Sequence, residues 1–251
     1  MADSGFIKAS RLAGGVLEPA RPIGICQPSV SEGLQVRAGH VVSAEAPTEA
    51  PRATLLGPNL CRDEVETARA QEYALLALLL GQAPDAPFLE RIAGLRGDAT
   101  PLGKAHAALA QAAGKASADT VEREFFDLFI GVGRGELLPY GSYYMTGFLN
   151  ERPLARLRAD LRALGIELVD ERYEPEDHAA ILCEIMAGLI GGEFSATSER
   201  QRHVFEKHLA PWIGRFFADL GAAKGADFYR HVGSVGHLFI GIEAEAFALG
   251  S

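Results

Sequence analysis

Residues 174–178 read Glu-Pro-Glu-Asp-His and place acidic side chains and a histidine beside an apolar stripe. We predict that a helix begins here, because proline suits a first helical position and carboxylates favour the positive end of the helix dipole. At about 100° per residue, His178 shares a face with the stripe, while Asp177 and Glu184 lie together on its flank. Carboxylates in such a place can form charge-assisted hydrogen bonds with a cationic group. The stripe consists of Ile181, Leu182, Ile185 and Leu189.

A second candidate surface lies at residues 137–144, which read Leu-Leu-Pro-Tyr-Gly-Ser-Tyr-Tyr. Tyr140, Tyr143 and Tyr144 stand close to one another and flank Ser142. Tyrosine rings offer apolar area with a polar tip at low entropy cost, which suits peptide binding. The alternative is that the rings fill the core and form local hydrogen bonds, and the sequence leaves both open.

The glycine run Gly-Val-Gly-Arg-Gly-Glu at residues 131–136 invites comparison with nucleotide-binding loops. A dinucleotide fingerprint requires a third glycine at position 136, a strand before it and a helix after it. Position 136 is Glu136, the preceding segment has a helical pattern, and the chain contains no P-loop motif. We therefore expect these glycines to end a helix and turn the chain, and we keep nucleotide binding at Gly131–Gly135 as an alternative.

Metal and nucleophile motifs are weak in this chain. The seven histidines form no His-Glu-x-x-His motif, and the spacing of His203 and His208 is not supported by a cysteine pair. There is no Gly-x-Ser-x-Gly elbow, and Cys183 points about 140° away from His178 on the same expected helix. We predict no metal, no cofactor and no catalytic residue.

Composition narrows the class of partner. The chain has 251 residues, is 48% hydrophobic and carries a net charge of −9, which argues against binding to a nucleic-acid backbone and permits a basic peptide. Three cysteines without a Cys-x-x-Cys pair indicate a reducing compartment. The longest apolar run, residues 74–80, is far shorter than the roughly 20 residues of a membrane span, and no secretory signal is evident, so we expect a cytoplasmic protein that does not insert into a membrane.

The chain divides near residue 60. Residues 1–60 are rich in Pro, Gly, Ala and Ser and hold one of the 20 aromatic residues, so we predict a disordered tail. The alternative is that part of this tail docks on the domain as a strand or short helix, with residues 16–17 and 23–25 as the candidates.

Residues 61–251 show a helical pattern almost throughout, and we predict one all-α domain of about eight to ten helices. Strand-like alternation is confined to residues 166–169. The segments expected to be helical are 64–80, 88–95, 102–113, 117–129, 142–149, 153–164, 175–190, 198–220, with a bend at Pro211, and 226–249.

With these segments in view, the chain resembles the TorD-like family of molybdoenzyme maturation chaperones, which includes the TorD, DmsD and NarJ groups. The family's aromatic-x-x-Leu-Phe element is similar to residues 125–129, and its Glu-Pro-x-Asp-His element is complete at residues 174–178. Residues 138–143 resemble its Pro/aromatic/Gly-Ser segment, although Tyr140 stands where some members have Trp. The resemblance covers roughly residues 64–249, and the long N-terminal tail departs from it.

The resemblance implies a non-catalytic, cytoplasmic chaperone. Its members bind the twin-arginine signal peptide of an apo-oxidoreductase, delay export and assist insertion of the molybdenum cofactor. Acids beside an apolar groove would suit such a peptide, because arginine pairs with carboxylates in bidentate geometry. The expected peptide-binding residues are Tyr140, Ser142, Tyr143, Tyr144, Glu174, Asp177, His178 and Glu184.

Two other readings stay open at this point. One is a small enzyme or nucleotide-binding protein, and the other is a helical adaptor that binds a folded partner. A structural role, with Asp177 as a helix cap and His178 as a tie between helices, would explain the motif without a ligand. The sequence does not decide between a monomer and a homodimer, and it does not name the client enzyme.

Overall fold

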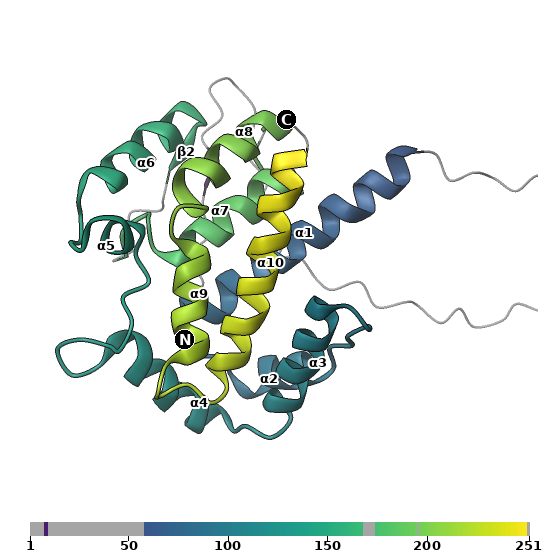
Figure 1. The fold of residues 1–251 in the computed structure, drawn as a ribbon, viewed down its shortest axis with the longest axis vertical. Coiled ribbons are helices and arrows are strands. Elements are labelled where there is room, and N and C mark those ends of the chain that lie inside the picture. The colour runs from purple at the N-terminus through teal and green to yellow at the C-terminus, as the bar shows by residue number, and fades with distance from the viewer. Residues whose placement is uncertain (1–7, 10–57, 168–173, 195, 250–251) are drawn as a thin grey trace, which may run out of the picture.

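Helices account for most of the computed structural model, which describes residues 8–9, 58–167, 174–194 and 196–249 (Figure 1). The prediction of an all-α domain is confirmed, with ten α-helices in the described part of the chain. They are α1 Pro58–Gly81, α2 Ala86–Ala93, α3 Pro101–Ala113, α4 Ala118–Phe125, α5 Gly141–Thr146, α6 Arg152–Ala163, α7 Ala179–Gly191, α8 Ser198–Val204, α9 Ile213–Ala222 and α10 Tyr229–Leu249. Two π-helical turns continue helices: η1 Phe126–Ile130 follows α4, and η2 Phe205–Leu209 follows α8.

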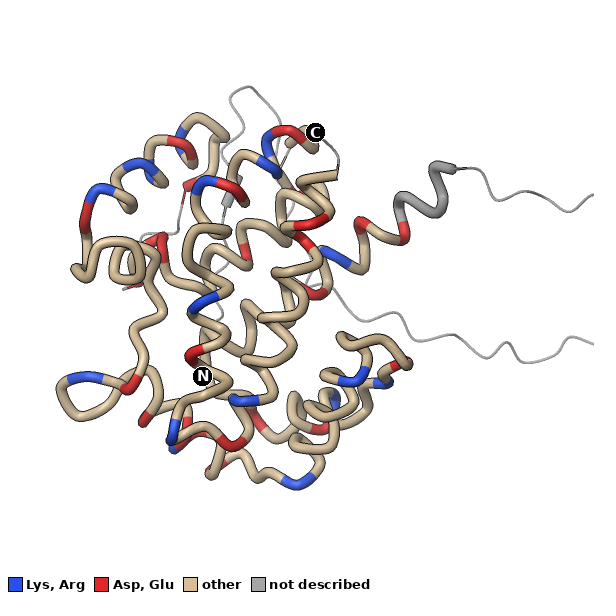
Figure 2. Tube along the Cα trace, in the orientation of Figure 1, with Lys and Arg blue, Asp and Glu red and all other residues tan. Residues whose placement is uncertain are grey.

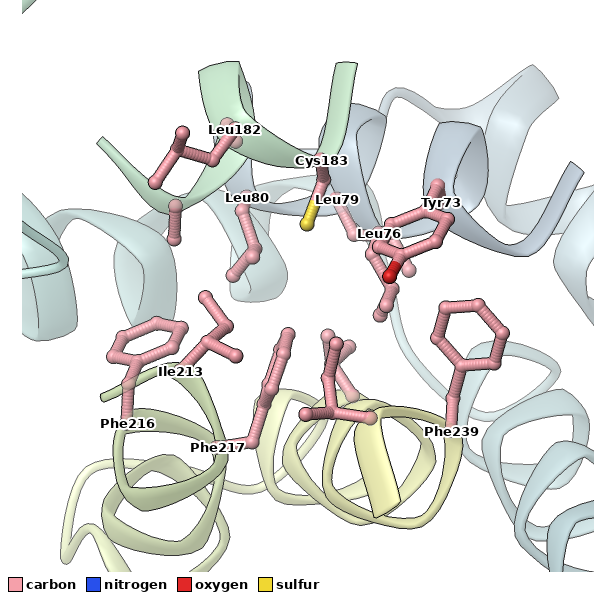
Figure 3. Close-up of a cluster of buried hydrophobic side chains, with 14 of the residues drawn as sticks. Tyr73, Leu76, Leu79, Leu80, Leu182, Cys183, Ile213, Phe216, Phe217 and Phe239 are labelled. Carbon is pink, nitrogen blue, oxygen red and sulfur yellow. The ribbon is translucent and has the colours of Figure 1, made fainter. Parts of the chain in front are cut away.

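The core lies between two pairs of long helices. Helix α1 packs along α7, and α9 packs along α10. Apolar side chains from both pairs meet in the space between them (Figure 3). Tyr73 meets Phe239 edge to face, with ring centroids 4.8 Å apart. Burial of these large side chains supplies the main stabilisation of the domain.

Polar side chains cap the first turns of several helices. Thr100 accepts a hydrogen bond from the backbone of α3, and Ser117 does the same for α4. Asp85 caps α2. Each of these polar side chains satisfies an N–H that the helix leaves unpaired.

The region around Pro211 breaks the helix rather than bending it. The expected helix 198–220 is divided into α8 with η2 and a separate α9, because proline cannot continue the backbone hydrogen-bonding pattern. The last helix is not broken by its glycines. A Cβ atom on Gly236 would lie 2.3 Å from the Phe217 ring, and one on Gly233 would lie 2.5 Å from the backbone of Gly221, so these glycines allow α9 and α10 to pack closely.

The N-terminal segment differs from the expectation in two ways. Helix α1 begins at Pro58, six residues before the predicted start at Glu64. Strand β1, Lys8–Ala9, pairs antiparallel with β2, Ile166–Glu167, so a docked strand exists but at other residues than those proposed. The rest of the expected tail, including residues 16–17 and 23–25, lies outside the described residues.

Within the described residues, helix α10 is long and apolar enough to cross a membrane. Its most apolar window is 44% buried inside the domain, where it packs against α9, α3 and α1, and the core helix of a globular protein meets the same test. Acidic and basic residues are interspersed over the outer helices (Figure 2).

Candidate functional site

The Glu-Pro-Glu-Asp-His segment is a turn that precedes α7, so the predicted helix start at Pro175 is wrong. His178 is the N-cap, and its Nδ1 atom accepts a hydrogen bond from Ala180 N at 3.1 Å. The backbone of this turn pairs with the segment before α5: Gly141 N donates to Asp177 O at 2.9 Å, and Ala179 N donates to Pro139 O at 2.8 Å. These tertiary hydrogen bonds, together with the turn hydrogen bond from His178 N to Pro175 O at 3.0 Å, keep residues 175–178 outside the helix.

Asp177 is buried and acts on α5. It is 3% exposed, and its Oδ2 atom accepts a hydrogen bond from Ser142 N at 2.7 Å. The carboxylate thus satisfies a free N–H in the first turn of α5, where negative charge is favoured. Asp177 Oδ1 and Ser142 Oγ are buried without a hydrogen-bond partner among the described residues.

Tyr140 and His178 join the two segments through their rings. The ring centroids are 5.1 Å apart in an edge-to-face arrangement, and the Tyr140 hydroxyl donates to Glu174 Oε2 at 2.5 Å. Burial, together with the nearby Glu174 carboxylate, raises the pKa of Tyr140, so the hydroxyl stays protonated. We call the paired segments 138–142 and 174–179 the Tyr140–His178 junction.

The apolar stripe of α7 does not form an open groove. Ile181, Leu182, Ile185 and Leu189 are each at most 2% exposed and belong to the hydrophobic core. Helix α7 is apolar on nearly all sides, which is typical of a central helix. Glu184 is half-buried on this helix and does not share a helical flank with Asp177, because Asp177 lies outside the helix. The expected acidic pair beside a groove is therefore replaced by a different arrangement.

An open hollow of about 440 Å³ lies on the other side of α5. We call it the tyrosine hollow, because the half-buried rings of Tyr143 and Tyr144 form part of its wall. Leu137 and Leu138 add apolar surface. The other lining residues are Arg134, Glu136, Gly147, Arg215 and Asp219.

Two arginines of the chain already lie on these rings. The Arg134 guanidinium carbon is 5.4 Å from the Tyr143 centroid, and Arg134 donates a hydrogen bond to the Tyr143 hydroxyl at 2.7 Å. Arg215 lies 5.7 Å from the Tyr144 centroid. Tyrosine faces attract guanidinium groups through the negative potential of the ring. The hollow thus already accommodates two guanidinium groups of the chain itself.

Two carboxylates, Glu136 and Asp219, line the same hollow but have different partners. Glu136 accepts backbone hydrogen bonds from Lys224 at 2.9 Å and Gly225 at 3.1 Å, which fixes the loop between α9 and α10. Asp219 accepts a hydrogen bond from the Tyr144 hydroxyl at 3.1 Å and lies 3.9 Å from Arg215. Burial and the Asp219 charge raise the pKa of Tyr144. Asp219, with a side chain 44% exposed, is the carboxylate open to an added cation.

Two of the nine residues that line the hollow are among those that the sequence predicts at a peptide-binding surface. Tyr143 and Tyr144 were expected at a binding surface, whereas Asp219 and Arg215 lie on α9, far along the chain. The local signal for them is an Arg-x-x-x-Asp spacing on an amphipathic helix, which is typical of a surface ion pair and does not indicate a binding site.

The glycine run ends η1 and turns the chain, as expected. Gly131 has a φ angle of +61° and donates to Phe126 O at 2.7 Å, which closes the π-helical turn. Within the described residues, no three metal-ligating side chains come together. Burial raises the pKa of the Cys183 thiol to about 12, so this cysteine is not a reactive thiolate.

Comparison with known proteins gives a consistent set of relatives. The family model of the nitrate reductase delta subunit matches residues 95–218. The TorD chaperone protein of Vibrio cholerae is 32% identical over 102 residues, which covers 37% of this chain and 46% of that protein. The TorD chaperone protein of Vibrio vulnificus is 36% identical over 90 residues, covering 34% and 40%. The chain thus matches somewhat less than half the length of these curated relatives, which are named as chaperones.

A solved structure follows a similar chain path. It is assigned as a candidate redox enzyme maturation protein from Archaeoglobus fulgidus, with 17% sequence identity and a TM-score of 0.47. The match covers 69% of this chain and 93% of that one.

Proposed function

We propose, because this chain belongs to the TorD-like family of redox enzyme maturation chaperones, that it is a dedicated cytoplasmic chaperone for a molybdenum-cofactor oxidoreductase. It binds the twin-arginine signal peptide or the apo-enzyme and aids cofactor insertion before export. The oxidoreductase catalyses the redox reaction, and the chaperone itself performs no catalytic turnover.

The observation that carries the proposal is the tyrosine hollow. It combines two tyrosine faces with the open carboxylate of Asp219, and both rings already hold guanidinium groups. Two rings and a carboxylate suit a pair of adjacent arginines, because each guanidinium can stack on a ring while it donates hydrogen bonds to an oxygen acceptor. We assign the paired arginines of the signal peptide to this hollow.

Exposed apolar side chains close in sequence to the lining residues suit the apolar part of the peptide. Phe148, 68% exposed, follows the lining residue Gly147, and Val132, 99% exposed, lies two residues before Arg134. Large exposed apolar side chains next to a polar hollow are typical of peptide-binding surfaces.

The remaining residues expected to contact the peptide receive different roles. Ser142, Asp177 and His178 are buried, so we assign them to holding α5 in position rather than to direct contact. Tyr140 and Glu174 hydrogen-bond to each other at the junction and are accessible enough to contact an extended ligand. Glu184 lies on α7, apart from the residues that line the hollow, and we propose no contact for it there.

Calorimetric titration with a twin-arginine signal peptide tests this proposal. Wild-type protein should bind the peptide and lose binding when both arginines are changed to lysine, since lysine lacks the planar fork. Asp219→Asn should weaken binding by about tenfold or more, because a hydrogen bond between charged groups is removed.

The matched control is Asp119→Asn, which makes the same change at an exposed position in the first turn of α4. It should bind as wild type. Equal affinity for the Arg-Arg and Lys-Lys peptides would overturn the assignment of this hollow, and no binding to signal peptides from several molybdoenzyme classes would overturn the proposed function.

A further inference from the structure

The glycine-flanked loop 131–135 carries Arg134. Its guanidinium group contacts Tyr143. Arg134 contacts the Tyr143 ring and hydroxyl, and it forms no ion pair with any described residue. The loop is anchored at its two ends, where Gly131 N bonds to Phe126 O and Glu136 N bonds to Asp127 O at 3.1 Å. Arg134 is thus placed on the ring by a loop that is fixed at both ends and open in the middle.

Glycines set the path of this loop. Gly131 and Gly133 have φ angles of +61° and +89°, which other residues rarely adopt. Gly135 is buried, and a Cβ atom there would lie 2.6 Å from Leu128 O, so only glycine fits. This backbone path brings the exposed Arg134 to Tyr143.

We propose that Arg134 is a built-in competitor that occupies, in the free chaperone, the Tyr143 face that an arginine of the client peptide takes on binding. This inference rests on the proposed function and adds the regulation of its site. The incoming guanidinium replaces the stacking and the hydrogen bond that Arg134 makes with Tyr143, and the Arg134 side chain turns into solvent while its loop keeps its backbone path. A ligand that lacks arginine gains nothing to offset this loss, so Arg134 sharpens the discrimination against lysine.

Two variants separate this role from simple charge repulsion. Arg134→Ala removes both the charge and the competitor, whereas Arg134→Lys keeps the charge and loses the planar group that stacks and hydrogen-bonds. The inference predicts that both variants bind a twin-arginine peptide roughly two- to fivefold more tightly than wild type, as expected for loss of an exposed cation–π contact. Tighter binding by Arg134→Ala alone would overturn the inference in favour of repulsion, and weaker binding by either variant would show that Arg134 contacts the peptide.

A second probe does not depend on the signal peptide. Argininamide is titrated into wild type, Arg134→Ala and Arg134→Lys while NMR follows the Tyr143 ring resonances. Both variants should respond at roughly two- to fivefold lower concentrations than wild type. That result without binding of any signal peptide would support the competitor and contradict the proposed function. If wild type binds the peptide and both variants bind it with the same affinity, the competitor role of Arg134 is overturned and the proposed function stands. The same conclusion follows if argininamide does not change the Tyr143 resonances of the variants.

Discussion

At the residue scale, carboxylates distant in sequence from their partners hold the ends of helices and loops. Asp177 accepts from Ser142 N at α5, and Glu136 accepts from two backbone N–H groups after α9. Glu124, 8% exposed, accepts hydrogen bonds from three consecutive backbone N–H groups at the start of α10. A carboxylate supplies enough acceptor sites for these groups and also matches the positive end of a helix dipole.

Changing Glu124 to Gln should destabilise the fold. Glu124 Oε1 accepts from Asp227 N and Tyr229 N, and Oε2 accepts from Phe228 N at 3.0 Å. In the variant an amide NH₂ group must replace one oxygen and meet a backbone donor, so the free energy of unfolding should fall by about 2 kcal/mol. Urea denaturation measures the change.

The control is Glu122→Gln on the same helix, where the side chain is exposed. It should alter the free energy of unfolding by less than about 0.5 kcal/mol. Equal effects of the two changes would show that the three hydrogen bonds to Glu124 contribute little.

At the element scale, a buried ion pair joins α1 to α10. Arg69 donates to both oxygens of Glu243, at 2.7 and 2.8 Å, and Glu243 is 1% exposed. The guanidinium also lies 5.1 Å from the Phe247 ring centroid. The N-terminal part of α1 extends beyond the other helices (Figure 1), so this pair helps to fix its direction.

Glu243→Gln should cost about 3 kcal/mol of unfolding free energy, because Arg69 loses its buried carboxylate partner and keeps only the more exposed Glu66. Glu245→Gln, at an exposed position two residues further on α10, is the matched control and should be nearly neutral. Denaturant midpoints measure the difference between the two variants, and Glu243→Gln should have the lower midpoint. Equal midpoints would contradict a stabilising role for the ion pair.

Helix positions were predictable where the signal is local. Thr100 and Ser117 cap the helices that their sequence neighbourhoods predict. The helix start predicted at Pro175 is wrong, because backbone hydrogen bonds to Pro139 and Gly141 hold its segment as a turn before α7. The sequence pattern of a single helix gives no sign of these bonds. Tertiary contacts override local preference at the Tyr140–His178 junction, where two motifs of the sequence meet.

At the scale of the whole molecule, the class of protein was easier to predict than the site. Helical periodicity and the ordered motifs identified an all-α, TorD-like chain. The carboxylate of the tyrosine hollow, Asp219, is brought to Tyr144 by the packing of α9 on the rest of the core, so spacing along the chain could not reveal it. Asp177 was identified as important, but its burial assigns it to support rather than to the open surface.

Two histidines should make the stability of the domain depend on pH, because folding shifts their pKa values in opposite directions. The hydrogen bond to Glu72 raises the pKa of His106 above 6.5, although partial burial opposes it. Burial lowers the pKa of His208 below 6.5, although its hydrogen bond to Asp160 opposes this. His106 links α3 to α1, and His208 links η2 to α6, so both pairs report on the packing of the domain.

The signs follow from proton linkage. A raised pKa means that the folded state binds the proton more tightly, so the contribution of His106 is fully present below pH 6.5 and is lost as pH rises through its folded pKa. A lowered pKa means the reverse, so the contribution of His208 is present above pH 6.5 and is lost as pH falls through its folded pKa. Stability should therefore be highest near neutral pH.

Replacing each histidine with glutamine removes one of these dependences. The difference in unfolding free energy between wild type and His106→Gln should shrink as the pH rises from about 5 to about 9, and the difference for His208→Gln should shrink as the pH falls over the same range. Urea denaturation at several pH values measures both. His237→Gln is the control, since this exposed histidine bonds only to a backbone carbonyl among the described residues. Slopes of the same sign for His106 and His208 would contradict the opposing roles of the Glu72 hydrogen bond and of burial, and would move the origin of the pH dependence to other groups.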